Sequence, residues 1–201
     1  MIGILGGTFN PLHNGHLLLA KGVAEVCGFE RVMLIPTNVP PHKAAPDLAS
    51  AEHRLEFCRL AAEEDSLFWP QDIEIKREGK SYTIDTLEEL AEIYPDEEFA
   101  LIMGADMFLT LHQWMRWKDI LKCATVCGVK RKGVPSELDE YAEGLRELGA
   151  KILLPETDVP EVSSTQLREM LKNGEDVGEL IPKNIADYIY ENGLYRKNQE
   201  L

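Results

Sequence analysis

The chain has 201 residues, of which 44% are hydrophobic and 28% charged, as is typical of a globular protein with one full hydrophobic core. Its formal net charge of -14 argues against general binding to nucleic acid or to anionic membranes, because phosphate-rich surfaces would repel it. No apolar run approaches the roughly 18 residues of a membrane span and no signal peptide is visible, so we expect a cytoplasmic protein.

The first part of the chain predicts a strand, a turn, a helix and a second strand. An apolar run over residues 1–5 is followed at once by two glycines, and apolar residues then recur at helical spacing over 14–27. The segment RVMLIP (31–36) predicts a buried strand, which completes a βαβ unit and implies a parallel sheet. Four prolines make 36–46 a loop.

Helical and strand patterns alternate through the rest of the chain. The predicted elements are a helix over about 50–64, a strand over 71–78, a helix within 81–95, a strand from 98 to Gly104, a strand over 124–133, a helix over about 137–148, a strand over 150–155, and helices over 163–174 and 181–195. The helix over 163–174 has Ser163 as its N-cap, Gln166 three residues later and Gly174 as its stop. We therefore predict an α/β class, with a doubly wound parallel sheet, in one domain over 1–201 that frays after about residue 195.

The four cysteines give no sign of a metal site or of disulfides. Cys27, Cys58, Cys123 and Cys127 form no CxxC pair, and each lies among apolar neighbours. We interpret them as reduced core thiols, which agrees with the cytoplasm.

The turn after the first predicted strand carries the clearest functional signal. The stretch GGTFNPLHNGH places a glycine pair directly before His13 and His16. Glycines at the carboxyl end of a strand let backbone N–H groups approach a phosphate, and the next helix adds its positive end. The stretch is neither a Walker loop nor a GxGxxG fingerprint. Because an imidazole at a helix N-terminus can donate to an anion, we favour a phosphate site over a turn with two satisfied polar residues.

Here the sequence resembles a known superfamily. GGTFNPLHNGH is similar to the first signature of the HxGH nucleotidyltransferases, and VSSTQLR, about 150 residues later, is similar to the second. The stretches PTNVPPHK (36–43), SYTIDTL (81–87) and GADMFLTLHQW (104–114) resemble the bacterial nicotinate-nucleotide adenylyltransferases. The resemblance implies a Rossmann-like nucleotidyltransferase fold and a reaction that joins ATP and nicotinate mononucleotide into deamido-NAD and pyrophosphate.

Other interpretations stay open at this point. An adenylyltransferase on the same scaffold could use nicotinamide mononucleotide or phosphopantetheine as the phosphate acceptor. A nucleotide-binding regulator could keep the fold and lose turnover. A nucleic-acid module is opposed by the acidic balance and by the lack of a basic stripe.

The resemblance also implies roles on the ATP side. His13 and His16 would donate to the phosphates, with His16 the first choice for the α-phosphate, Lys43 would lie near the phosphates, and Arg168 would neutralise the leaving pyrophosphate. The expected ATP-binding residues are Gly6, Gly7, Thr8, Phe9, Asn10, Gly104, Asp106, Ser164 and Thr165. Asp106 follows a strand end, where an acid suits a ribose hydroxyl, although it could also cap the next helix.

On the mononucleotide side, the resemblance implies a second set of residues. His42 would lie near the phosphate, Trp114 would stack on the pyridine ring, and backbone N–H groups near Thr83 and Met115 would bind the ring carboxylate. Arg131 would reach the phosphate or the carboxylate. Mg²⁺ is expected as an ion bound by phosphates, so we predict no metal-ligand residue. The expected partners are these small-molecule substrates, with no nucleic acid and no membrane, and a homo-oligomer is left open.

Overall fold

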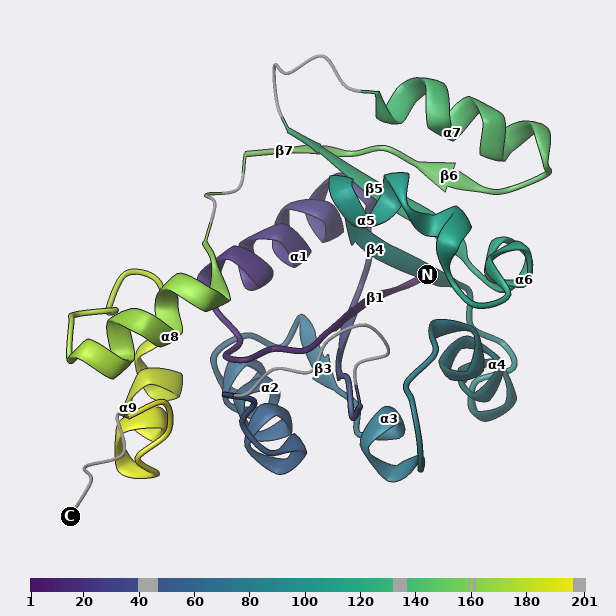
Figure 1. The fold of residues 1–201 in the computed structure, drawn as a ribbon. Coiled ribbons are helices and arrows are strands. Elements are labelled where there is room, and N and C mark those ends of the chain that lie inside the picture. The colour runs from purple at the N-terminus through teal and green to yellow at the C-terminus, as the bar shows by residue number, and fades with distance from the viewer. Residues whose placement is uncertain (40–46, 132–136, 159, 161, 197–201) are drawn as a thin grey trace.

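The computed structural model describes residues 1–39, 47–131, 137–158, 160 and 162–196, in which a seven-stranded parallel sheet is flanked by helices (Figure 1). The strands are β1 (Ile2–Gly7), β2 (Val32–Pro36), β3 (Phe68–Pro70), β4 (Phe99–Gly104), β5 (Thr125–Arg131), β6 (Ile152–Leu153) and β7 (Glu156–Thr157). Their order is β3-β2-β1-β4-β5-β6, and β7 pairs with β5. The order reverses between β1 and β4, so the predicted doubly wound α/β class is confirmed.

The helices cover both faces of this sheet. They are α1 (Asn14–Cys27), α2 (Ala51–Glu64), α3 (Ile73–Lys76), α4 (Thr83–Ile93), α5 (Ala105–Leu109), α6 (Trp117–Cys123), α7 (Leu138–Glu147), α8 (Ser164–Asn173) and α9 (Lys183–Glu191), with a 3-10 helix η1 (Leu111–Gln113). The predicted ends of α8 are confirmed. The Ser163 hydroxyl accepts from the backbone N–H of Gln166 at 3.5 Å, and Gly174 ends the helix at a φ of 73°. No element of the described residues is a helix long and apolar enough to cross a membrane.

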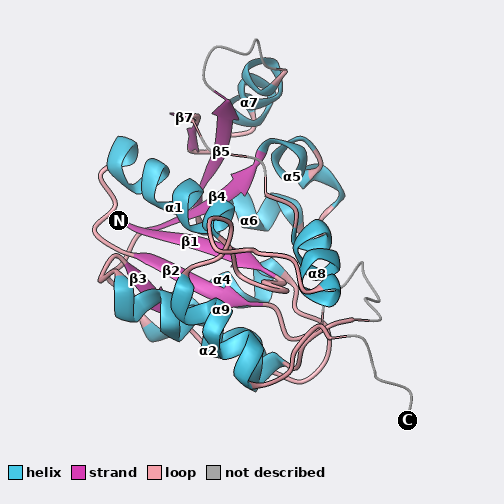
Figure 2. Cartoon of the chain, turned by 90° about the vertical axis from the view of Figure 1, so that its left-hand side faces the viewer, coloured by secondary structure: helices cyan, strands magenta, loops and turns pink. Residues whose placement is uncertain are grey.

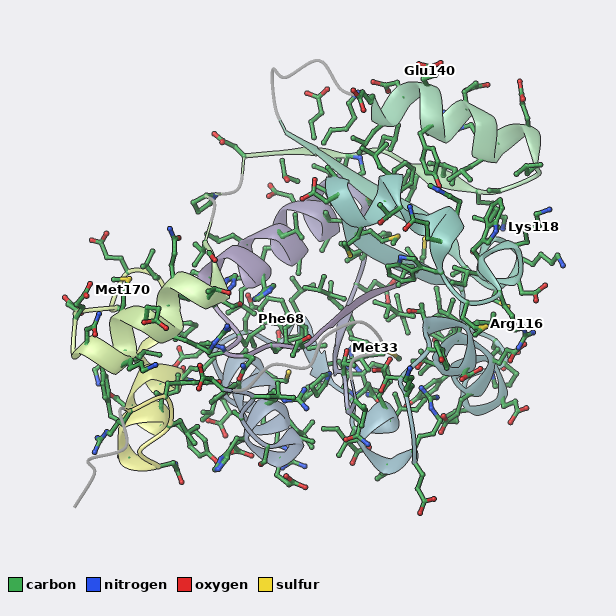
Figure 3. The ribbon with its side chains drawn as sticks, viewed as in Figure 1. Met33, Phe68, Arg116, Lys118, Glu140 and Met170 are labelled. Carbon is green, nitrogen blue, oxygen red and sulfur yellow. The ribbon has the colours of Figure 1, made fainter. Side chains whose placement is uncertain are left out.

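Alternate residues of the central strands enter two different hydrophobic cores. In β1, Leu5 packs in the core formed with α1, α2, α8 and α9, whereas Ile4 packs in the core formed with α4, α5, α6 and α7. A strand buried on both faces has this period of two. Figure 2 shows α1, α2 and α9 on the near side of the strands. In Figure 3, Met33 of β2 lies in the interior of the molecule, whereas Lys118 and Glu140 point to solvent.

The prediction of a strand over 71–78 is wrong. The edge strand β3 lies just before this segment and pairs with β2, and α3 forms one helical turn at Ile73–Lys76. The neighbours Ile73 and Glu74 are both buried, which the alternation of a half-exposed strand would not allow. The short alternation of apolar residues over 71–78 therefore predicted the wrong element. The three residues of β3 take the place beside β2 that this strand would have needed.

The strand predicted over 150–155 is shortened to β6, and a second short strand, β7, follows it. β6 and β7 pair with successive parts of β5 and are separated by Leu154 and Pro155. Proline has no N–H to donate to the ladder, whereas its carbonyl accepts from the backbone N–H of Lys130 at 2.9 Å.

The cysteines are free, as predicted, but they are not all in the core. Cys58 and Cys127 are buried and Cys27 is half-buried, whereas Cys123, the last residue of α6, is exposed. The interpretation of Cys123 as a core thiol is therefore wrong.

Candidate active site

The carboxyl ends of β1 and β4 lie at the point where the strand order reverses. β1 ends at Gly7 and β4 at Gly104, and the register that pairs Ile4 with Leu101 brings these ends to the same level. Open α/β sheets bind their ligands at this edge, outside the carboxyl ends of the strands. The glycine pair and the predicted nucleotide-binding segment 104–106 therefore meet at one place.

His13 and His16 stack on each other at the N-terminus of α1. Their ring centroids are 3.6 Å apart and their planes are inclined by 21°. His13 is the N-cap residue and is buried, and the ring of Phe9 meets His16 edge-on at 5.2 Å. Gly15 makes room for this pair, because a Cβ at that position would lie 3.1 Å from Nδ1 of His13.

Both imidazoles are neutral at pH 7. Burial lowers the pKa of His13 to about 4, and burial together with the neighbouring His13 lowers the pKa of His16 well below its usual value. The backbone N–H of His13 donates to Nδ1 of His16 at 3.4 Å, which assigns the proton of neutral His16 to Nε2. His16 is therefore a hydrogen-bond donor that carries no charge of its own.

The free energy of unfolding is expected to fall as the pH drops from about 6.5 to about 4. An unfolded histidine titrates near 6.5 whereas folded His13 has a pKa of about 4, so between these values the unfolded state binds more protons. The loss from His13 is about 3 kcal/mol. Urea unfolding at several pH values measures it, and a His13→Gln variant should show a shallower dependence. An equal dependence in both proteins would refute the low pKa.

Arg168 joins the second motif to the first. Its Nη1 donates to the backbone carbonyl of Asn10 at 2.9 Å, and its Nη2 donates to Oγ1 of Thr165 at 3.2 Å. Asn14, the first residue of α1, is held in the same region by a backbone hydrogen bond to the carbonyl of Leu180 at 2.9 Å. Arg168 and Asn10 are 158 positions apart in the chain, and the two motifs lie together where α8 approaches the start of α1 (Figure 1).

The side chain of Asn10 is occupied by protein groups. Its Nδ2 donates to the carbonyl of Asp47 at 3.0 Å, and its Oδ1 accepts from the N–H of Ala49 at 3.0 Å and from the hydroxyl of Tyr195 at 2.6 Å. Burial raises the pKa of Tyr195, which keeps the phenol protonated as a donor. Asn10 thus fixes the shape of the loop after β1. Because its side chain is already bonded to protein groups, a ligand would contact the backbone of that loop.

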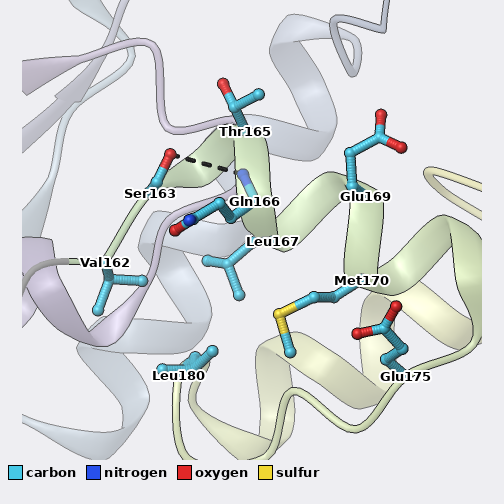
Figure 4. Close-up of a pocket in the computed structure, with 9 residues that line it drawn as sticks. All are labelled: Val162, Ser163, Thr165, Gln166, Leu167, Glu169, Met170, Glu175 and Leu180. Carbon is cyan, nitrogen blue, oxygen red and sulfur yellow. Dashed lines mark hydrogen bonds between the residues drawn. The ribbon is translucent and has the colours of Figure 1, made fainter.

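A pocket of about 450 Å³ opens beside the start of α8 (Figure 4). Its lining residues are Val162, Ser163, Thr165, Gln166, Leu167, Glu169, Met170, Glu175 and Leu180. The carboxylates of Glu169 and Glu175 would repel a phosphate. This pocket is therefore a neighbour of the predicted phosphate site, with which it shares Thr165, and not the phosphate site itself.

Asp106 does not cap a helix. Gly104 is the N-cap residue of α5, and Asp106 is exposed in the first turn of that helix. The interpretation of Asp106 as a cap is wrong, whereas its exposure at the end of β4 leaves the carboxylate accessible to a ligand.

The segments expected to bind the pyridine ring are adjacent. Thr83 begins α4, and half-buried Trp114 and exposed Met115 lie between η1 and α6. α4 packs against α6, and Arg116 donates from both terminal nitrogens to Glu88 of α4, at 3.0 and 2.7 Å. This bidentate pair ties the Trp114 segment to the helix that Thr83 begins.

Three predicted site residues cannot be placed by their side chains. His42 and Lys43 lie outside the described residues, and for Arg131 only the backbone, the last residue of β5, is described.

Sequence reasoning missed Arg54 of α2, which is buried at 1% exposure. Its guanidinium donates to the carbonyls of Ala49 and Thr8 at 3.0 Å, of Asn38 at 3.1 Å, and of Thr37. A signal was present, because Arg54 lies one helical turn before Cys58 on the apolar stripe of this helix. A charged residue on a buried stripe needs hydrogen-bond partners, and here they are the chain segments that leave β1 and β2.

The chain matches one class of known proteins over most of its length. A family model described as Cytidylyltransferase-like matches residues 4–170, so the fold and the paired motifs are those of a cytidylyltransferase-like protein. The nicotinate-nucleotide adenylyltransferase of Bacillus subtilis is 39% identical over 196 residues, which are 96% of this chain and 97% of the relative. A probable nicotinate-nucleotide adenylyltransferase of Desulfitobacterium hafniense is 39% identical over 97% of this chain and 95% of its own. The chain belongs to the nicotinate-nucleotide adenylyltransferase family.

Solved structures agree on the fold. The nicotinic acid mononucleotide adenylyltransferase of Plasmodium falciparum complexed with NaAD superposes with a TM-score of 0.77 at 18% identity, over 96% of both chains. The same protein complexed with APC gives a TM-score of 0.76 at 18% identity, again over 96% of both chains.

Proposed function

We propose that this chain transfers the adenylyl group of ATP to nicotinate mononucleotide, giving deamido-NAD and pyrophosphate in NAD biosynthesis. The contact between Arg168 and Asn10 carries the proposal, because it unites the two motifs at the β1–β4 edge in a family named for this reaction. The proposal includes one catalytic domain over 1–201 that works in the cytoplasm.

The reaction needs no nucleophile from the protein. A 5′-phosphate oxygen of the mononucleotide attacks the α-phosphorus of ATP, a new P–O bond forms, and the bond to the bridging oxygen of the leaving pyrophosphate breaks. The attacking oxygen is already anionic, so catalysis consists of aligning two anions and stabilising charge in the transition state.

The ATP side of the site supplies donors. Nε2–H of His16 donates to an α-phosphate oxygen, and stacking on His13 fixes the orientation of the ring. Arg168 and Lys43 neutralise the pyrophosphate as it leaves, and Asp106 binds a ribose hydroxyl. The remaining proposed ATP contacts come from Gly6, Gly7, Thr8, Phe9, Asn10, Gly104, Ser164 and Thr165.

The mononucleotide side combines stacking with backbone donors. Trp114 stacks on the pyridine ring, and backbone N–H groups near Thr83 and Met115 bind its carboxylate. The exposed side chain of Met115 is not needed for this. His42 and Arg131 are the proposed partners of the acceptor phosphate.

Mg²⁺ is proposed to enter with ATP. Within the part of the chain that the structure describes, no group of three His, Cys, Asp or Glu side chains could hold a metal ion, which fits an ion carried by phosphates. The ion would neutralise charge on the triphosphate. EDTA in excess is expected to abolish turnover, and added Mg²⁺ to restore it. The melting temperature of the chain without ATP should not change, and a large change would reveal a metal bound by the protein itself.

Pyrophosphate release from ATP with each of three acceptors tests the proposed function. We expect nicotinate mononucleotide to give a higher kcat/KM than nicotinamide mononucleotide or phosphopantetheine. A higher value for either of these would overturn the acceptor assignment. Binding of ATP with no release from any acceptor would favour the regulator that has lost turnover.

A further inference from the structure

Arg54 connects the segments that follow two neighbouring strands. Its Nη1 reaches the carbonyls of Thr8, just after β1, and of Thr37, just after β2, and its Nη2 reaches the carbonyl of Asn38 at 3.1 Å. The backbone N–H of Thr37 also donates to the carbonyl of Gly7 at 2.9 Å. The guanidinium therefore locks the loop proposed to hold the ATP phosphates onto the end of β2.

The same end of β2 holds the segment that leads to the ring-binding residues. Nδ2 of Asn38 donates to the carbonyl of Arg77, and its backbone N–H donates to Oγ of Ser81, both at 3.1 Å. The backbone N–H of Ser81 donates in return to the carbonyl of Val39 at 3.1 Å. Thr83, whose backbone is proposed to bind the ring carboxylate, begins α4 two residues after Ser81. A continuous path of hydrogen bonds thus runs from the ATP loop through Arg54 and Asn38 to the mononucleotide side.

The charge of Arg54 suits this place. The hydrogen-bond partners of the guanidinium are backbone carbonyls. Burial lowers the pKa of Arg54, whereas the carboxylates of Glu52 and Glu74 act on it by longer-range attraction, which raises its pKa, and a guanidinium stays protonated in proteins. A buried positive charge that is hydrogen-bonded to backbone carbonyls favours the approach of two anionic substrates.

We propose that Arg54 is a positioning residue that sets the placement of the ATP half of the site relative to the mononucleotide half, an inference that rests on the proposed function. The reacting atoms must come within about 3–3.5 Å of each other, so a shift in either half lowers the rate. The rigid fork of a guanidinium can hold four carbonyls at once, whereas the single nitrogen of lysine cannot.

Three variants separate the parts of this path. Arg54→Lys keeps the charge and loses the fork, Arg54→Met loses both, and Asn38→Ala removes only the side-chain bond to Arg77. Arg59→Lys is the matched control, because Arg59 lies on the same helix and is exposed in an ion pair with Glu56.

Steady-state kinetics with both substrates, well below each melting temperature, give the test. We expect Arg54→Lys to lower kcat about tenfold or more and to raise KM for both substrates. Asn38→Ala should raise KM for the acceptor about fivefold and leave KM for ATP within twofold, and Arg59→Lys should match the wild type. If Arg54→Met does not fold, Arg54→Lys decides the matter.

Two results would overturn the inference. One is Arg54→Lys with kcat and both KM values within twofold of wild type, even if its stability falls, since a merely structural arginine would behave in this way. The other is Asn38→Ala with equal changes in both KM values. The assay uses whichever acceptor the wild-type chain turns over, so a wrong acceptor assignment leaves the comparison intact. If none is used, calorimetric titration with ATP replaces it, with weaker binding by Arg54→Lys expected and unchanged binding contradictory.

Discussion

Replacement of His16 by alanine is expected to lower kcat by about 10²- to 10³-fold, the usual cost of removing one preorganised donor from a developing anion. The neutral ring is fixed by its stack on His13 and by the backbone N–H at Nδ1, so its Nε2–H is oriented before substrate arrives. In the alanine variant, water would take the place of the Nε2–H donor of His16, and a water molecule is not preorganised. Pyrophosphate release at saturating substrates measures the loss.

The control for this prediction is His53→Ala. His53 is a half-buried histidine of α2 whose ring pairs with the hydroxyl of Tyr188 at 2.9 Å, and it has no proposed role in the reaction. Far-ultraviolet circular dichroism should show that both variants keep their helices. If His16→Ala retains kcat within about threefold of the wild type, the catalytic assignment fails.

Replacement of Gly128 by alanine is expected to destabilise the chain by about 2–3 kcal/mol, a typical cost of overpacking a core. A Cβ at this position of β5 would lie 2.6 Å from Cδ2 and 2.7 Å from Cγ of Phe108, whose ring is completely buried. Phe108 is the buried residue of α5 that packs this helix against the sheet, and α5 carries Asp106. We therefore expect KM for ATP to rise along with the loss of stability, which urea unfolding measures.

The matched control is Gly144→Ala in α7. This glycine is exposed, and a Cβ there would meet nothing within 4 Å. Alanine is the better helix former, so the variant should be as stable as the wild type or up to about 1 kcal/mol more stable. Equal losses in the two variants would show that contact with Phe108 is not the cause.

The pattern of strands and helices in the sequence was sufficient to predict a doubly wound sheet. Strands that alternate with helices, and a glycine turn after the first strand, already implied a doubly wound fold with a ligand site at the end of β1. The segment 71–78 failed because a few alternating apolar residues suit either a strand or a buried helical turn, and only the pairing of β3 with β2 distinguishes them.

The candidate site was only partly accessible from the sequence. The glycine pair and the two histidines are neighbours in the chain, so their meeting at a helix N-terminus followed from local structure. The contact of Arg168 with Asn10 depends on how α8 returns to the sheet, which no local pattern states. The resemblance predicted that the two motifs share a site, but not this contact. Arg54 was missed because an arginine on a helix usually marks its solvated face, and its acceptors here are carbonyls on three separate loops.

The bonds that hold Asn10 also set an order of events during synthesis. Arg168 and Tyr195, which hold its carbonyl and its side chain, are translated 158 and 185 residues later. On the ribosome, the β1–α1–β2 unit can form early from contacts between neighbouring segments, as domains do when they fold from the N-terminus. The loop that bears Asn10 gains its last support only when residue 195 has left the exit tunnel. A nascent chain therefore carries the histidine motif long before the loop beside it has all of its supporting hydrogen bonds.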